Sequence, residues 1–149
     1  MIRYLKGNLF MADAEALVNP VNEVGVSGKG LALQFKKAHP ENFKLYATAC
    51  RAQHVRVGQM FTTSVVGCRC DWIVNFPTKK HWRDPSQPAW IVAGLLDLRN
   101  VIQARLIRSI AIPALGCGLG GLPWPEVSNM IAIALDGLDC DIQVFPPRD

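Results

Sequence analysis

The sequence of 149 residues lacks any long hydrophobic segment. No run approaches the roughly 18 consecutive apolar residues that a membrane-spanning helix requires. The first ten residues, MIRYLKGNLF, do not contain the apolar stretch of a signal peptide. We therefore predict a cytoplasmic protein with no membrane partner.

The sequence also lacks regularly spaced cysteines. Its five cysteines are odd in number and irregularly placed, at Cys50, Cys68, Cys70, Cys117 and Cys140. Such a pattern indicates neither a disulfide framework nor a Cys-x-x-Cys zinc site. We expect reduced thiols that mostly pack in the core, with no bound metal and no other cofactor.

Charge of either sign is sparse. Charged residues make up 19% of the chain, the formal net charge is +4, and the basic residues are scattered. This mild excess is compatible with a polyanionic partner without requiring one. Half of the residues are hydrophobic, which excludes a disordered chain, and no repeat, linker or low-complexity segment divides the sequence. We predict one domain over residues 1–149.

Short apolar runs typical of strands alternate with segments of helical periodicity. The predicted strands are 2–5, 16–18, 60–66, 72–75, 110–114 and 142–145, and the predicted helices are 29–39, 41–51, 88–104 and 123–135. Ser86 is expected to cap the third of these helices. The alternation predicts an α/β fold, a three-layer α/β/α sandwich with a mixed, largely parallel central sheet.

Two glycine-rich turns, at 24–32 and 113–122, each follow an apolar run and precede a helix. Backbone N–H groups at such a turn can converge on an anion, which the helix dipole also favours. Either turn alone is more typical of an ordinary tight turn, but the pair could hold a diphosphate. Neither has the spacing of a P-loop or of a dinucleotide-binding fingerprint.

Asn22 follows the second predicted strand, in what we expect to be a loop. Its side-chain amide offers a donor and an acceptor that suit a sugar hydroxyl. The alternative is an Asx turn in which the amide holds its own loop.

The segment NFPTKKHWRDPS, residues 75–86, combines cations, aromatic side chains and two prolines. We expect an irregular loop after residue 75, because proline interrupts helices and strands, at the strand ends where open α/β sheets bind ligands. A partly desolvated lysine can act as a nucleophile, which makes Lys79 and Lys80 catalytic candidates. A solvated, phosphate-binding surface is the alternative. His81, Trp82 and Arg83 could stack on nucleobases and bind DNA, or could simply anchor the loop.

Together these motifs resemble those of the macrodomain family. The resemblance covers nearly the whole chain, through GNLF, NPVNxVGVxGKGLALQFKK, NFPTKxHWR and SIAIPxLGCGxGGLxW. It is strongest to macrodomains of the DarG antitoxin type, and extends to human terminal ADP-ribose glycohydrolase. The resemblance implies a hydrolase that removes ADP-ribose from thymine bases of single-stranded DNA, as the antitoxin to a DNA ADP-ribosyltransferase.

The implied partners are ADP-ribose, ADP-ribosylated single-stranded DNA and the cognate toxin. In the family a further region contacts the toxin, so direct toxin contact is expected outside these 149 residues. Two other functions stay open. One is an ADP-ribose reader without turnover, and the other is a hydrolase of protein-linked ADP-ribose.

The resemblance also implies the ADP-ribose site. Its members would be Asn8, Leu9, Asn22, Ser27, Gly28, Lys29, Gly30, Leu31, Gly116, Cys117, Gly118, Leu119, Gly120, Gly121 and Phe145. The two glycine turns would enclose the diphosphate. Asn8, Leu9 and Phe145 would lie near the adenine, and Asn22 would face the distal ribose, where the reaction occurs.

The alignment places Lys79 at the lysine that attacks the distal ribose, with Lys80 as the second candidate. Lys79 would either form a transient adduct or steer the departing base electrostatically. Two positions depart from the relatives. Gly120 stands where the human relative has an aspartate, so no lysine–aspartate pair is available. Asn8 stands where many macrodomains have the aspartate that contacts adenine.

Overall fold

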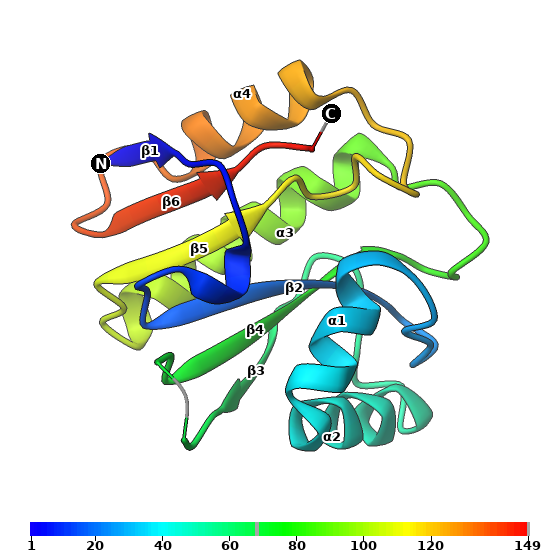
Figure 1. The fold of residues 1–149 in the computed structure, drawn as a ribbon. Helices are drawn as coiled ribbons and strands as arrows, with labels where there is room; N and C mark the ends of the chain where they lie inside the picture. Colours follow the sequence, from blue (N-terminus) through cyan, green and yellow to red (C-terminus); the bar gives the residue numbers. More distant parts are fainter. Residues whose placement is uncertain (68, 149) are drawn as a thin grey trace.

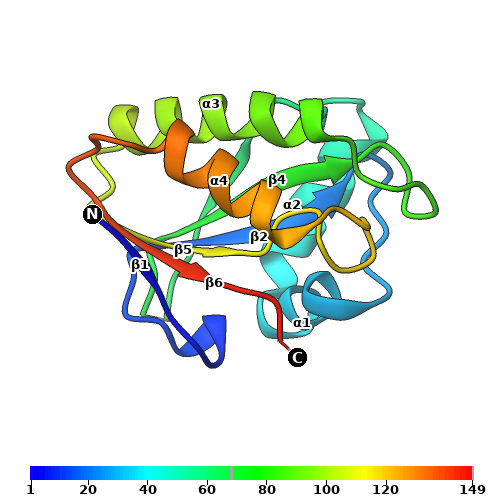
Figure 2. The same cartoon turned by 90° about the horizontal axis from the view of Figure 1, so that it is seen from above.

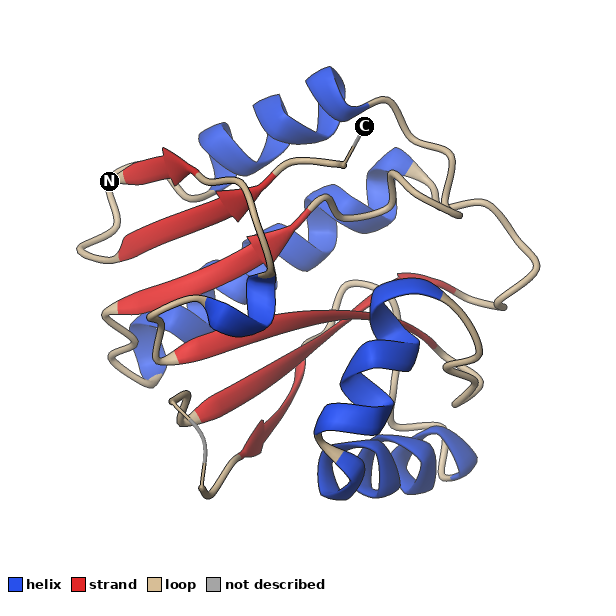
Figure 3. Cartoon of the chain, viewed as in Figure 1, coloured by secondary structure: helices blue, strands red, loops and turns tan. Residues whose placement is uncertain are grey.

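The computed structural model describes residues 1–67 and 69–148, whose strands form a six-stranded sheet in the order β1-β6-β5-β2-β4-β3. The strands are β1 (Ile2–Tyr4), β2 (Ala16–Asn22), β3 (Phe61–Ser64), β4 (Trp72–Lys79), β5 (Ser109–Pro113) and β6 (Asp141–Phe145). All neighbours pair in parallel except β3, which is antiparallel to β4 (Figure 3). The predicted mixed, largely parallel sheet is therefore confirmed.

Helices cover both faces of this sheet (Figures 1 and 2). One face carries α3 (Pro88–Ala104) and α4 (Trp124–Ala134), and the other carries the short 3-10 helix η1 (Leu9–Met11), α1 (Gly30–Ala38) and α2 (Pro40–Arg51). The three-layer sandwich is confirmed. Within the described residues, no helix has the length and apolar character needed to cross a membrane.

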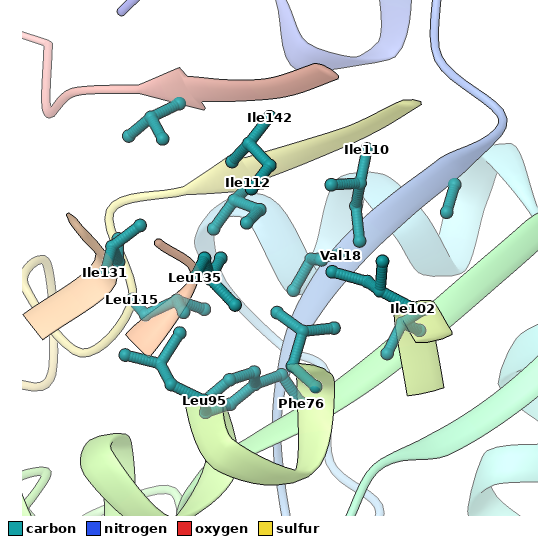
Figure 4. Packing of buried hydrophobic residues seen from close by; sticks show 14 of the residues in the cluster. Val18, Phe76, Leu95, Ile102, Ile110, Ile112, Leu115, Ile131, Leu135 and Ile142 are labelled. Carbon is teal, nitrogen blue, oxygen red and sulfur yellow. The ribbon is translucent and has the colours of Figure 1, made fainter. Parts of the chain in front are cut away.

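The alternating side chains of the strands divide the core between the two faces. Val18 and Phe76 belong to the cluster that packs under α3 and α4, which also contains Leu95 of α3 (Figure 4). Leu17 is one residue from Val18 on β2, Ile73 is three residues from Phe76 on β4, and both pack in a second cluster on the other face. Fully burying each such side chain contributes about 1.5–3 kcal/mol, so both clusters stabilise the sheet whose strand ends carry the loops.

Both central strands run further than the sequence indicates. β2 continues through Pro20 to Asn22, and β4 continues through Pro77 to Lys79. Predicting that the prolines end these strands was therefore wrong. Beyond Asn75, β4 has a paired strand only on its β2 side, and β2 pairs with β5 only at its first two residues. Proline is tolerated there because it faces no second strand that requires its N–H.

The predicted helix cap is also wrong. The N-cap of α3 is Gln87, and no side chain caps this helix. Ser86 instead donates its backbone N–H to the carbonyl of Gly120 at 3.0 Å, and its buried hydroxyl has no hydrogen-bond partner among the described residues. Ser86 therefore joins the segment before α3 to the second glycine turn.

Three of the cysteines fit the reduced-thiol prediction. Cys50, Cys117 and Cys140 form no disulfide, and burial raises the pKa of each thiol. Cys68 lies outside the described residues. Among the described residues, no group of three or more His, Cys, Asp or Glu side chains could hold a metal ion.

Candidate active site

A cleft of about 980 Å³ opens at the carboxyl ends of the parallel strands. Both glycine-rich turns line it, as do the last residues of β2 and β4 and the segment after β6. The predicted site residues that line it are Asn8, Leu9, Asn22, Gly28, Lys29, Gly30, Leu31, Lys79, Trp82, Arg83, Gly116, Cys117, Gly118, Leu119, Gly120 and Phe145. Segments that are far apart in the sequence therefore meet at one cavity.

The charges around this cleft are of one sign. Its lining includes the cations Lys29, Lys79, Arg83 and Arg148, and among the described residues it includes no aspartate or glutamate. Such a cleft attracts an anion, and guanidinium and ammonium groups bind phosphate oxygens well. It also offers no carboxylate pair of the kind that most glycoside hydrolases use.

The two lysines of the TKK segment have different surroundings. Lys79 is half-buried at the end of β4 and lines the cleft, where its Nζ donates to the carbonyl of Trp82 at 3.3 Å. Burial lowers the pKa of Lys79, and the nearby Asp84 carboxylate partly opposes this shift. Lys80 is exposed and does not line the cleft, and its Nζ lies 5.5 Å from the centre of the Trp90 ring. The geometry therefore favours Lys79 over Lys80 as the candidate nucleophile.

Asn22 is the last residue of β2, and its side chain holds the turn that follows. Its Oδ1 accepts hydrogen bonds from the backbone of Val24, Gly25 and Val26 at 3.0–3.3 Å, and its Nδ2 donates to the Val26 carbonyl at 2.7 Å. This is the Asx-turn alternative. The amide lines the cleft, but its oxygen is already engaged, so Asn22 mainly fixes the first glycine-rich turn.

A buried tyrosine on α2 supports this turn from behind. The hydroxyl of Tyr46 lies 2.7 Å from the Asn22 carbonyl and 3.0 Å from Asn22 Oδ1, and it accepts the Asn22 backbone N–H at 3.3 Å. Tyr46 is 1% exposed, and desolvation raises its pKa far above the usual value. Tyr46 is not recognisable as a site residue from the sequence, because its helical spacing indicates only a core position.

The second glycine-rich turn has little room for side chains at one point. Gly116 and Gly121 adopt φ values of +73° and +78°, which favour glycine. A Cβ at Gly120 would overlap the Gly116 carbonyl oxygen and the Ser86 hydroxyl. The Gly120 position is therefore closed to any side chain in this chain.

The HWR segment forms a small stack beside the cleft. The Arg83 guanidinium lies 4.7 Å from the centre of the Trp82 ring, and the His81 and Trp82 ring centres are 5.3 Å apart. His81 Nδ1 accepts the backbone N–H of Arg83 at 3.1 Å, which holds the segment in shape. Trp82 is 46% exposed, so its ring can contact a ligand as well as anchor the loop.

The opposite end of the cleft is formed by the segments after β1 and β6. Asn8 Oδ1 accepts the backbone N–H of Phe10 at 3.0 Å and so caps η1. Leu9 and Phe145 are buried there and present an apolar wall. The resemblance to macrodomains predicts that the adenine lies against this wall.

Four predicted site residues do not line the cleft: Ser27, Lys80, His81 and Gly121. Other residues do so unexpectedly, including Gly7, Thr78, Pro146 and Arg148. Arg148 also donates to the Gly7 carbonyl at 3.2 Å. These residues follow or end parallel strands. The rule that ligands bind at the carboxyl ends of such strands could have identified them.

Comparison with known proteins gives consistent matches. The family model of the Macro domain matches residues 18–131. A DNA ADP-ribosyl glycohydrolase from Thermus aquaticus is 49% identical over 99% of this chain and 41% of its own length. The chain therefore spans about two fifths of this curated relative.

Solved structures of related proteins have the same fold as this chain. The macrodomain of Mycobacterium tuberculosis DarG superposes with a TM-score of 0.98 at 49% identity, covering 99% of each chain. Thermosipho africanus DarTG in complex with ADP-ribose gives a TM-score of 0.93 at 31% identity, covering 98% of this chain and 41% of that one.

Proposed function

The chain belongs to the macrodomain family, and from this membership we propose that it is a DNA ADP-ribosyl glycohydrolase. Its substrate is ADP-ribose attached to a thymine base of single-stranded DNA, and its products are free ADP-ribose and the repaired base. The relative from Thermus aquaticus bears the name of this activity. A solved Thermosipho africanus relative contains ADP-ribose.

The observation that carries the proposal is the position of Lys79. Lys79 lines the cleft and stands opposite Asn22 at the ends of β4 and β2. Burial lowers the pKa of its amine. A lowered pKa increases the fraction of neutral amine, which is the nucleophilic form. No carboxylate among the described residues lines the cleft, and Lys79 places an amine level with Asn22 at the strand ends, so we assign the attack at the anomeric carbon to Lys79.

The proposed reaction has two steps. The lone pair of Lys79 Nζ forms a bond to the anomeric carbon of the distal ribose as the bond to the thymine nitrogen breaks, and the base leaves with the electron pair and takes up a proton. Water then attacks the same carbon, the bond to Nζ breaks, and free ADP-ribose departs. The lysine is regenerated in this second step.

The other parts of the cleft provide binding. The backbone N–H groups of the two glycine-rich turns and the Lys29 ammonium neutralise the diphosphate. The apolar wall of Leu9 and Phe145 takes the adenine. Trp82 and Arg83, stacked at the other side, hold the DNA by contacts with a base and a phosphate.

We further propose that the chain acts as the antitoxin of a DNA ADP-ribosyltransferase in the cytoplasm. A Thermosipho africanus relative that is 31% identical over 97% of this chain carries the name of a fusion of such a transferase with a DNA ADP-ribosyl glycohydrolase. A transferase that modifies DNA requires a matching activity that removes the modification in the same compartment.

The direct test is release of ADP-ribose from a single-stranded oligonucleotide with one ADP-ribosylated thymine, followed by chromatography. Lys79→Ala should lower the rate at least about 100-fold while the affinity for free ADP-ribose persists. Lys80→Ala is the matched control and should retain the rate, because Lys80 lies outside the cleft.

Two outcomes would contradict the proposal. If the wild-type chain binds ADP-ribose but releases none from the oligonucleotide, the protein is a reader. If it releases ADP-ribose only from a glutamate-linked protein adduct, the substrate class is wrong. Retained activity in Lys79→Arg would assign Lys79 an electrostatic role, because arginine keeps the charge and does not lose its proton.

A further inference from the structure

The pairing of β2 with β4 shifts by one position at the cleft. The two strands lie side by side (Figure 1), and their register is regular from Ala16 opposite Trp72 to Val21 opposite Pro77. The next pair is Asn22 opposite Lys79. Thr78 is therefore an extra residue in β4, which is the arrangement of a β-bulge.

This shift decides where the lysine stands. Residues paired across neighbouring strands share a face of the sheet, and each step along a strand changes the face. Without the shift, Thr78 would stand opposite Asn22, and Lys79 would lie one position beyond the end of β2. With the shift, Lys79 stands level with Asn22, at the reacting end of the cleft.

Thr78 has side-chain contacts suited to holding the shift. It is 5% exposed and lines the cleft, and its Oγ1 donates to the Val21 carbonyl at 3.4 Å. The preceding residue, Pro77, has no N–H to offer to β2. The hydroxyl of Thr78 thus ties β4 to β2 at the point where the regular register ends.

We propose that Thr78 is a positioning residue, whose place as the extra residue of β4 and whose hydroxyl bond to Val21 hold Lys79 level with Asn22 in the cleft. The inference rests on the proposed function and adds to it a residue between the strand and the reacting lysine. Thr78 acts through Lys79, because its own hydroxyl is bonded to the neighbouring strand.

The matched pair of variants is Thr78→Val and Thr78→Ser. Valine keeps the branched shape that suits a strand but lacks the hydroxyl, whereas serine keeps the hydroxyl and loses one methyl group. We expect Thr78→Val to lower kcat about 10- to 100-fold, because a displacement of roughly 1 Å at a reacting group has effects of this size. Thr78→Ser should stay within about threefold of the wild type, and both should bind free ADP-ribose as the wild type does.

A second readout follows the lysine itself. The rate at which an amine-acylating reagent modifies Lys79, measured by peptide mass spectrometry across a pH series, reports its protonation and does not require turnover. In Thr78→Val the profile should move toward higher pH, toward that of an ordinary lysine, because Lys79 leaves its partly desolvated place. In Thr78→Ser it should remain in the wild-type position.

These readouts separate the two proposals. If the wild-type chain shows no turnover, the proposed function fails, while the acylation profiles still decide the role of Thr78. The positioning role is overturned if Thr78→Val keeps the wild-type Lys79 profile, or if Thr78→Ser changes as much as Thr78→Val. Equal losses of ADP-ribose affinity and melting temperature in both variants would also overturn it, since Thr78 would then be a general packing residue.

Discussion

Adding one methyl group at Gly120 tests whether the second glycine-rich turn is a fixed part of the cleft. In Gly120→Ala the new Cβ overlaps the Gly116 carbonyl oxygen and the Ser86 hydroxyl. Neither can move freely. The Gly116 carbonyl accepts the Leu122 N–H at 2.9 Å, and the Ser86 N–H donates to the Gly120 carbonyl at 3.0 Å.

The expected magnitude follows from these contacts. Forcing an extra carbon into a close-packed site costs about 1–3 kcal/mol. In a domain of this size each kcal/mol lowers the melting temperature by about 2–4 °C, so Gly120→Ala should melt about 2–12 °C lower. Displacement of the turn should also raise the Kd for ADP-ribose about tenfold, which corresponds to about 1.4 kcal/mol.

Gly118→Ala is the matched control for stability. Gly118 lies in the same turn, and a Cβ there meets no heavy atom within 4 Å. Its free energy of unfolding should change by no more than about 0.5 kcal/mol. The assays are thermal unfolding and calorimetric titration with ADP-ribose, both on the full chain.

Ser86→Ala in the Gly120→Ala background separates the two overlaps. It removes the hydroxyl but leaves the Gly116 carbonyl, so it should restore part of the lost stability, with a coupling energy within about 0.5–3 kcal/mol. Equal melting temperatures for Gly120→Ala and Gly118→Ala would refute the close packing of this turn. A coupling energy of zero between Gly120→Ala and Ser86→Ala would also refute this close packing.

Two further substitutions probe the surroundings of the reacting groups. Asp84→Asn removes the carboxylate that raises the pKa of Lys79, so that pKa should fall; because the neutral amine reacts, the rise of activity with pH should move to lower pH in a pH–rate profile. An unchanged or higher midpoint would contradict this. Tyr46→Phe removes the hydroxyl that bonds Asn22 and should lower the free energy of unfolding by about 1–3 kcal/mol in denaturant titration, with weaker ADP-ribose binding. Full stability and affinity in Tyr46→Phe would show that the hydroxyl does not hold the Asn22 turn.

The order of the elements was predictable because it depends on local patterns. Each predicted strand and helix exists, and the glycine-rich turns stand where the apolar runs end. The ends of β2 and β4 were not predictable, since a proline ends a strand only where a second strand needs its N–H. That condition depends on which strands are neighbours and where their pairing stops, and neither is written in the local sequence.

The candidate site likewise combines residues that local sequence patterns identify with residues whose role depends on contacts between distant segments. The glycine-rich turns were singled out because they occur as a pair, and Lys79 was preferred to Lys80 only through the resemblance to macrodomains, since a lysine pair by itself is equally typical of a solvated surface. The contributions of Tyr46 and Arg148 were not identified, since a helical tyrosine suggests only packing and a cation near a terminus suggests only a solvated surface. Their contacts with Asn22 and Gly7 join residues that are far apart in the sequence.

The most direct test of Lys79 as nucleophile is to trap its adduct with ADP-ribose. During turnover of the ADP-ribosylated oligonucleotide, borohydride should reduce the ring-opened imine form of the adduct to a stable secondary amine, which peptide mass spectrometry can locate. The adduct should appear on Lys79 in the wild type and in Lys80→Ala, and it should be absent from Lys79→Ala. Rapid turnover with no trapped adduct, or an adduct on Lys80, would contradict the proposed mechanism.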